Sequence, residues 1–140
     1  MCLDERLEEL GRLLGKREAP HAQALERARA RAEQLRADIA RALEGFLEAA
    51  HATGAAFMEA EVSAVRPDDK HLRAFQFELC RGHHCAIVTV KSRAEVTLVG
   101  PFRVGKAEGP CRSFPLEESD EFAASLLDFV SSFVEQAASP

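Results

Sequence analysis

The residues best suited to chemistry lie in the run Cys80-Arg-Gly-His-His-Cys85. If Gly82-His83 forms a tight hairpin turn, Cys80 and Cys85 stand opposite each other on neighbouring strands, close enough to bridge or to bind one ion. Arg81 and the two histidines would favour the thiolate form, and the register leaves both thiols accessible. The run therefore predicts a candidate metal site of Cys80, His83 and Cys85, or a redox-active disulfide.

Zinc needs four ligands, and Cys111 or His71 would have to complete the set. Structural zinc sites usually offer two closely spaced ligands in each of two places, and the second place is missing here. No cofactor is therefore expected, with zinc as a minor alternative. The favoured interpretation is two incidental cysteines near the tip of a hairpin.

Two further motifs suggest chemistry less strongly. Gly100-Pro-Phe-Arg-Val-Gly-Lys106-Ala107 has the spacing of a phosphate-binding loop, but alanine replaces the hydroxyl residue that would hold magnesium. Glu108-Gly-Pro110 also cannot begin the helix that such a loop requires. Asp68-Asp-Lys-His71 could supply an acid and a base, but a hydrated turn has no pocket to shift their pKa values. Both segments are interpreted as polar turns.

Composition limits the class of protein. The 140 residues are 46% hydrophobic and 29% charged, which predicts one folded domain. The formal charge of −5 is spread along the chain, so no basic surface for nucleic acid is expected. No apolar run is long enough to span a membrane, and the acidic start is unlike a signal peptide. We expect a cytoplasmic protein with reduced cysteines.

The elements that position these residues begin with helices. Leu3, Leu7, Leu10 and Leu14 have helical spacing, and the stretch from Gly15 to Pro20 then predicts a short turn. A second, long helix is expected from about Pro20 to Thr53, ended by Gly54. Its apolar residues alternate steps of three and four and form a heptad seam: Leu25, Ala28, Ala32, Leu35, Ile39, Ala42, Phe46 and Ala49.

The seam predicts pairing with another helix. At 1.5 Å per residue the long helix spans roughly 50 Å, more than a small domain, so part of it must project. If the first helix folded back on the long helix within one chain, it would be too short to cover the whole seam. The predicted interface between two copies is therefore formed by the seam residues Leu25, Ala28, Ala32, Leu35, Ile39 and Ala42.

The remainder of the chain alternates with the period of strands. Apolar residues at 58–64, at 75–79, at 86–90 and at 96–99 predict an antiparallel meander of about four strands, with a turn at 66–71. Hairpin register pairs Leu79 with Ala86, Phe77 with Val88 and Phe75 with Val90. The stretch 100–115 is expected to be irregular. A last helix, capped near Ser119, carries Phe122, Leu126, Phe129, Val130 and Phe133.

The predicted fold is a single α+β domain over residues 1–140, with a helical arm at 1–53, a sheet at 54–117 and a helix packed on it at 118–140. The favoured function is a non-enzymatic interaction or adaptor module that forms a homodimer and binds another protein. One alternative is a thiol-based metal or redox sensor using Cys80 and Cys85. The other is an enzyme or small-ligand-binding protein with a pocket between sheet and helices.

Overall fold

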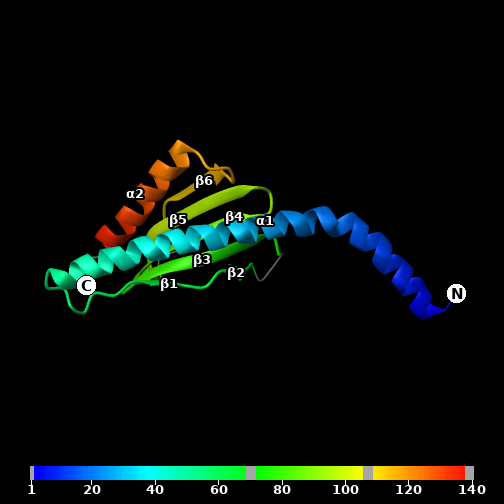
Figure 1. Ribbon diagram of the computed structural model, residues 1–140, viewed down its shortest axis with the longest axis horizontal. Helices are drawn as coiled ribbons and strands as arrows, with labels where there is room; N and C mark the ends of the chain where they lie inside the picture. Colours follow the sequence, from blue (N-terminus) through cyan, green and yellow to red (C-terminus); the bar gives the residue numbers. More distant parts are fainter. Residues whose placement is uncertain (1, 69–71, 106–108, 138–140) are drawn as a thin grey trace.

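A computed structural model describes residues 2–68, 72–105 and 109–137. It has the predicted α+β class, with a long N-terminal helix, an antiparallel sheet and a C-terminal helix (Figure 1). The elements in chain order are α1 (Leu3–Ala52), β1 (Glu61–Val62), β2 (Arg66–Pro67), β3 (Ala74–Arg81), β4 (His84–Lys91), β5 (Glu95–Arg103), β6 (Cys111–Pro115) and α2 (Asp120–Gln136).

The prediction of two opening helices is wrong, because α1 runs without a break through Pro20. A proline in a helix removes one backbone hydrogen bond and costs about 3 kcal/mol. The residues around Pro20 are exposed, so the Lys16 carbonyl that loses its donor can be hydrated. Good helix formers on both sides, such as Glu18 and Ala22, then carry the helix across.

The C-terminus of α1 lies where the sequence predicts it. Gly54 has φ = +114°, a left-handed conformation that glycine adopts without steric cost. The Gly54 N–H donates to the His51 carbonyl at 3.2 Å, and the Ala55 N–H donates to the Ala50 carbonyl at 3.0 Å. These two bonds form a Schellman motif that satisfies the last carbonyls of the helix.

The central hairpin is confirmed in every paired residue. Gly82, with φ = +57°, lies in the turn, and β3 and β4 pair Leu79 with Ala86 and Phe77 with Val88, as predicted. The sheet order is β1-β3-β4-β5-β6, with β2 also paired to β3, and all pairs are antiparallel. The strand period of two therefore determined the register correctly.

The strand expected over residues 58–64 is reduced to β1, two residues long. The Ser63 hydroxyl accepts the Glu78 N–H at 2.9 Å, in the place of a backbone carbonyl. The carbonyls of Val62 and Ser63 accept from the Arg36 guanidinium of α1, at 3.2 and 2.7 Å. Side chains thus take over hydrogen bonds at this edge, and regular pairing stops.

Two segments expected to be turn or irregular are partly strand. Arg66–Pro67 forms β2, although the sequence predicts a turn there. The predicted irregular stretch contains the end of β5 and all of β6, which pairs Val96 with Phe114 and Val99 with Cys111. Phe114 is buried and stacks edge-on against Phe122 of α2, at 5.5 Å between ring centroids. This tertiary contact is the reason that a Pro-rich segment becomes a strand.

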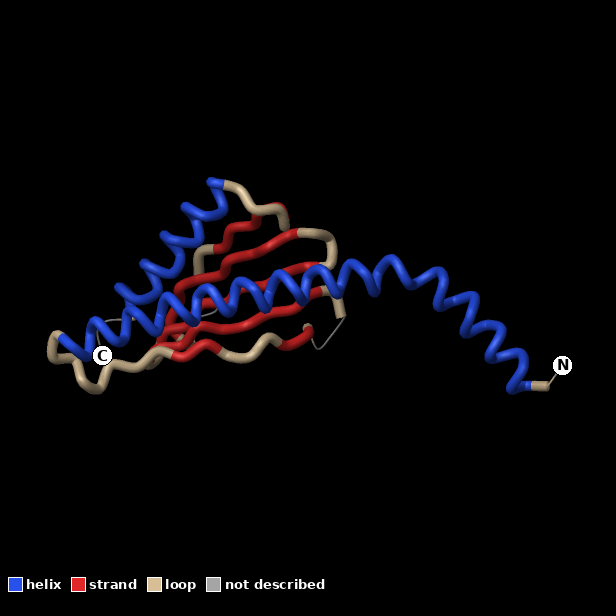
Figure 2. Tube along the Cα trace, viewed as in Figure 1, coloured by secondary structure: helices blue, strands red, loops and turns tan. Residues whose placement is uncertain are grey.

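Both helices lie on the same face of the sheet (Figure 2). Ser119 caps α2 as predicted, since its side chain accepts the Phe122 N–H at 3.0 Å. Apolar side chains from both helices and from one face of the strands form the core: Ala28, Ala32, Leu35, Ile39, Leu43, Phe77, Leu79, Ala86, Val88, Val90, Val96, Leu98, Phe114, Phe122, Phe129 and Phe133.

The N-terminal part of α1 projects beyond the sheet, as Figure 1 shows in dark blue. Residues 3–20, here called the arm, are exposed except for Leu10, which is half-buried. The first described contact between this end of the helix and the sheet region is His21 Nε2, 3.3 Å from the Leu72 carbonyl oxygen. The arm is therefore held at one end only.

Candidate interaction surface

The structure places most of the predicted seam inside the molecule. Ala28, Ala32, Leu35 and Ile39 are at most 2% exposed, because the chain's own β3 and β4 cover them. Leu25 is half-buried. Within a single copy, these residues are core.

The last seam residues turn away from the sheet. Ala42 and Ala49 are exposed, whereas Leu43 is 3% exposed. A helix has 3.6 residues per turn, so a strict 3.5-residue seam rotates by about 20° per heptad. The buried stripe of α1 therefore passes from Ile39 to Leu43, and Ala42 reaches the surface.

The surface that stays exposed is the leucine stripe of the arm, formed by Leu3, Leu7, Leu10 and Leu14. Leu3 is 72% exposed, Leu7 55% and Leu14 41%. Their spacing of four, three and four residues puts them on one face of the helix. Large apolar groups in such an arrangement are typical of a helix that packs against a partner.

The charges of the arm are segregated along its length. The first half carries Asp4, Glu5, Glu8 and Glu9 against one arginine, a net of −3. The second half carries Arg12, Lys16 and Arg17 against Glu18, a net of +2. The arm therefore presents an acidic end and a basic end to any partner.

A second apolar surface lies between the two helices. This α1–α2 groove has a volume of about 310 Å³ and is open to solvent. Leu127 of α2 lines it and is 68% exposed. Its other apolar lining residues are Ile39, Ala42, Leu43 and Phe46 from α1 and Ala123, Leu126, Val130 and Val134 from α2.

The groove continues into a polar depression of about 350 Å³ at the N-terminal end of α2. The two share Asp38, Ala123 and Leu126. The charged lining here is Arg31, Asp38, Glu118 and Asp120, a net of −2. One end of the groove is thus apolar and the other acidic.

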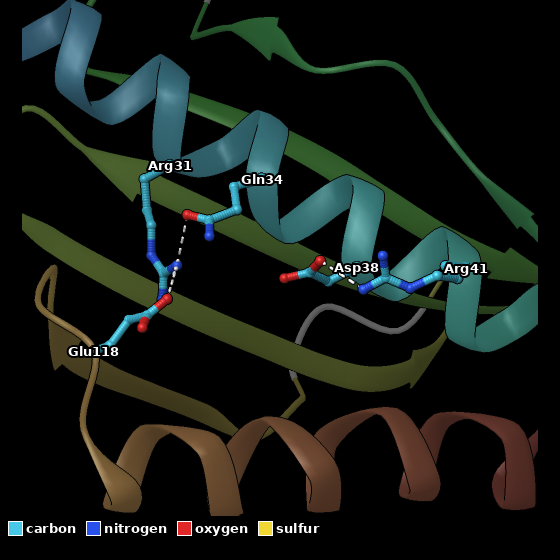
Figure 3. A network of polar contacts seen from close by, with 5 residues as sticks. All are labelled: Arg31, Gln34, Asp38, Arg41 and Glu118. Atoms are coloured by element: carbon cyan, nitrogen blue, oxygen red, sulfur yellow. Dashed lines mark hydrogen bonds and ion pairs between the residues drawn. The ribbon is translucent and has the colours of Figure 1, made fainter.

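Arg31 connects the two helices at this acidic end (Figure 3). Its guanidinium donates to Gln34 at 3.0 Å and to Glu118 at 3.1 Å, and it lies 5.5 Å from the centre of the Phe122 ring. Asp38, further along α1, pairs with Arg41 at 2.9 Å. The Arg31 contacts fix the separation of α1 from the start of α2.

Sequence reasoning missed the groove. The signal was present in α2, where Leu127, Val130 and Val134 extend the apolar surface beyond the phenylalanine stripe that faces the sheet. A helix that packs only on a sheet needs a single apolar face. The additional width indicates a second contact.

The hairpin brings Cys80 and Cys85 together as predicted. They are paired across β3 and β4, with 3.5 Å between the two Sγ atoms, and both are free thiols. The expectation that both are accessible is wrong, because Cys85 is 7% exposed. Cys85 pairs with Phe102 of β5, and the register between β4 and β5 shifts directly after it.

The electrostatic environment of Cys80 opposes thiolate formation. Burial, then a hydrogen bond to Cys85, then the charges of Cys85, Glu78 and Glu61 raise the pKa of the Cys80 thiol from 9.0 to about 12. Arg81 does not offset this, because its guanidinium donates to the Val134 carbonyl at 3.0 Å. The Cys80 thiol therefore lies close to the Cys85 sulfur but is held in its protonated, less reactive form at neutral pH.

Among the described residues, no third ligand lies beside the thiol pair. His83 is exposed at the turn, and within the described ranges no three His, Cys, Asp or Glu side chains lie together in a way that could hold a metal ion. Cys111 is on β6, separated from β4 by β5. His71, proposed as a fourth ligand, lies outside the described residues.

The other candidate motifs form no site in the described part of the chain. Gly100 belongs to β5 and donates its N–H to the Pro110 carbonyl at 2.6 Å, so this segment is a strand end and not a loop before a helix. Lys106 and Ala107 lie outside the described residues, as do positions 69–71 of the acidic turn.

A smaller cavity of about 170 Å³ lies between α2 and β5–β6. Arg112, Ser125, Asp128 and Ser132 supply its polar groups. Pockets for small organic ligands usually measure about 300–1,000 Å³. This cavity is smaller than that range, whereas the α1–α2 groove, at about 310 Å³, lies at its lower limit.

No described helix of the chain is both long and apolar enough to cross a bilayer. Comparison with protein-family models, with curated proteins and with solved structures gave no match. The arm, the groove and the thiol pair are the features of the molecule that point to a function.

Proposed function

We propose that the protein is a non-enzymatic interaction module that forms a homodimer through its N-terminal helix, using the arm in place of the buried seam. The observation that carries this proposal is the leucine stripe of the arm, which is exposed on a helix that projects from the folded domain.

The composition of the arm supports the need for a partner. An isolated helix of this length is marginally stable in water, because most helical stability in proteins comes from tertiary packing. Gly11 and Gly15 each cost about 1 kcal/mol relative to alanine, and Pro20 costs more. A partner that buries the leucines would offset these costs.

Charge reversal of the stripe tests the proposal. We expect wild-type protein to sediment as a dimer in analytical ultracentrifugation, and Leu7→Glu to raise the dimer dissociation constant at least about tenfold. The physical reason is that dimerisation would bury a carboxylate among leucines.

Ala19→Glu is the matched control, since it adds the same charge to the opposite face of the exposed arm. Circular dichroism should show that both variants stay folded, because neither position contributes to the core. If the wild type were a monomer at about 100 µM, its dimer dissociation constant would exceed that concentration, and this would contradict the proposal.

The thiol pair supports a second candidate, a redox sensor that closes a Cys80–Cys85 disulfide. The 3.5 Å separation of the sulfur atoms favours it, whereas the raised pKa of Cys80 opposes it. We rank it below the interaction module for that reason.

A further inference from the structure

We propose that the arm of each copy seats in the α1–α2 groove of a second copy, antiparallel to that copy's α1. This inference depends on the proposed homodimer and names the surface that receives the arm. It pairs the leucine stripe of the arm with the apolar lining of the groove.

The first argument is the area that a stable dimer needs. Two arms packed only on each other would bury eight leucines, at roughly 100 Å² of apolar surface each. Since about 60% of an interface is apolar, the total area would be about 1,300 Å², near the lower limit for a stable dimer. Stable interfaces bury about 1,200–2,000 Å². Seating each arm in a groove adds the apolar lining of two grooves and leaves neither Leu127 nor the leucine stripe exposed.

The second argument is length. Leu3 and Leu14 are 11 residues apart, and so are Leu35, which lines the polar depression, and Phe46, which lines the far end of the groove. Both spans are about 16 Å at 1.5 Å per residue. The stripe therefore has the length of the groove and the polar depression together.

Charge determines the direction. The basic half of the arm complements the acidic end of the groove, where Asp38 and Asp120 lie. Leu14 then lies near Leu35, and Leu3 lies near Phe46 at the apolar end. This orientation is antiparallel to α1 and places Leu7 opposite Ala42.

Symmetry requires the same direction. A dimer in which both copies donate an arm and receive one is isologous, with a two-fold axis across the helices. Such an axis makes the two long helices antiparallel. A parallel arrangement would pass each arm to the next copy and would produce an open chain of molecules.

Cysteine cross-linking between two differently substituted chains tests the seating. Both chains carry Cys2→Ser and Cys111→Ser to remove the exposed native thiols. When Leu7→Cys protein is mixed with Ala42→Cys protein and mildly oxidised, we expect a covalent heterodimer on a non-reducing gel. Ala19→Cys, on the other face of the arm, should not cross-link to Ala42→Cys.

The other possible results of cross-linking and ultracentrifugation distinguish failure of the arm seating from failure of the homodimer. A heterodimer of Leu7→Cys with Leu14→Cys but not with Ala42→Cys would show arm-to-arm pairing and overturn the seating, while the homodimer stands. A dimer with no cross-link in either mixture would also overturn it. A monomer in ultracentrifugation would overturn the homodimer itself.

The groove can also be tested directly. Leu127→Glu should raise the dimer dissociation constant at least about tenfold, whereas Gln136→Glu, exposed on the side of α2 that lines the smaller cavity, should change it less than about threefold. Equal and small effects of both variants would contradict the seating.

Discussion

At the scale of single residues, the environment of a side chain decided its chemistry more than its sequence neighbours did. Arg81 adjoins Cys80 in the chain, yet its guanidinium is directed to the Val134 carbonyl, and carboxylates of β1 and β3 act on the thiol. The pairing of the two cysteines followed from the strand period, whereas the raised pKa of Cys80 followed mainly from burial.

The raised pKa of Cys80 leads to a prediction about reactivity and pH. At pH 8 we expect Cys80 to be alkylated by iodoacetamide at least about tenfold more slowly than the exposed Cys2 and Cys111, as measured by peptide mass spectrometry. The redox candidate would gain support if Cys80 reacted as fast as Cys2.

The same shift has a consequence for stability. A thiol with a raised pKa in the folded state stabilises the fold fully below pH 9 and loses that contribution as the pH rises toward about 12. Urea unfolding of the wild type should therefore weaken more between pH 8 and pH 10.5 than unfolding of Cys80→Ala.

At the scale of elements, the long helix shows how a regular pattern can be assigned to the wrong partner. A helix in a coiled coil and a helix packed on a sheet would both bury the apolar residues from Ala28 to Ile39. The two arrangements differ in which residue they bury next. Leu43 is buried and Ala42 is exposed, which identifies the sheet as the partner.

This difference predicts opposite effects at adjacent positions. Leu43→Ala should lower the free energy of unfolding by about 2–5 kcal/mol, because it leaves a cavity in the core. Ala42→Ser should change it by less than about 0.5 kcal/mol. Urea denaturation measures the loss in free energy of unfolding for both variants. Similar losses would indicate that the heptad seam, and not the sheet, describes the packing of α1.

At the scale of the whole molecule, the domain and the arm have separate sources of stability. The domain has a core shared by the sheet and both helices. The arm has no packing partner among the described residues of the domain, and the first described contact with the sheet region is made by His21 at its base. Formation of the arm helix should therefore be coupled to dimerisation.

Hydrogen exchange measures this coupling. Amides of residues 7–18 should be protected in concentrated wild-type protein and exchange at least about tenfold faster in Leu7→Glu, while amides of β4 keep their protection. Equal exchange of the arm in both proteins would mean that its helix needs no partner.

Local patterns in the sequence determined the α+β class, the hairpin with its register, the glycine end of α1 and the serine cap of α2. Each of these depends on neighbouring residues, and so the periods of 2 and 3.6 and the chemistry of turns sufficed.

The tertiary structure decided the rest. It covered the seam with the chain's own sheet, made β6 a strand through the contact of Phe114 with Phe122, and buried Cys85. It also brought α1 and α2 together as the two sides of a groove. These features depend on which distant segments of the chain meet on one face of the sheet. An apolar stripe in the sequence indicates that it must be buried, but it does not indicate which segment buries it.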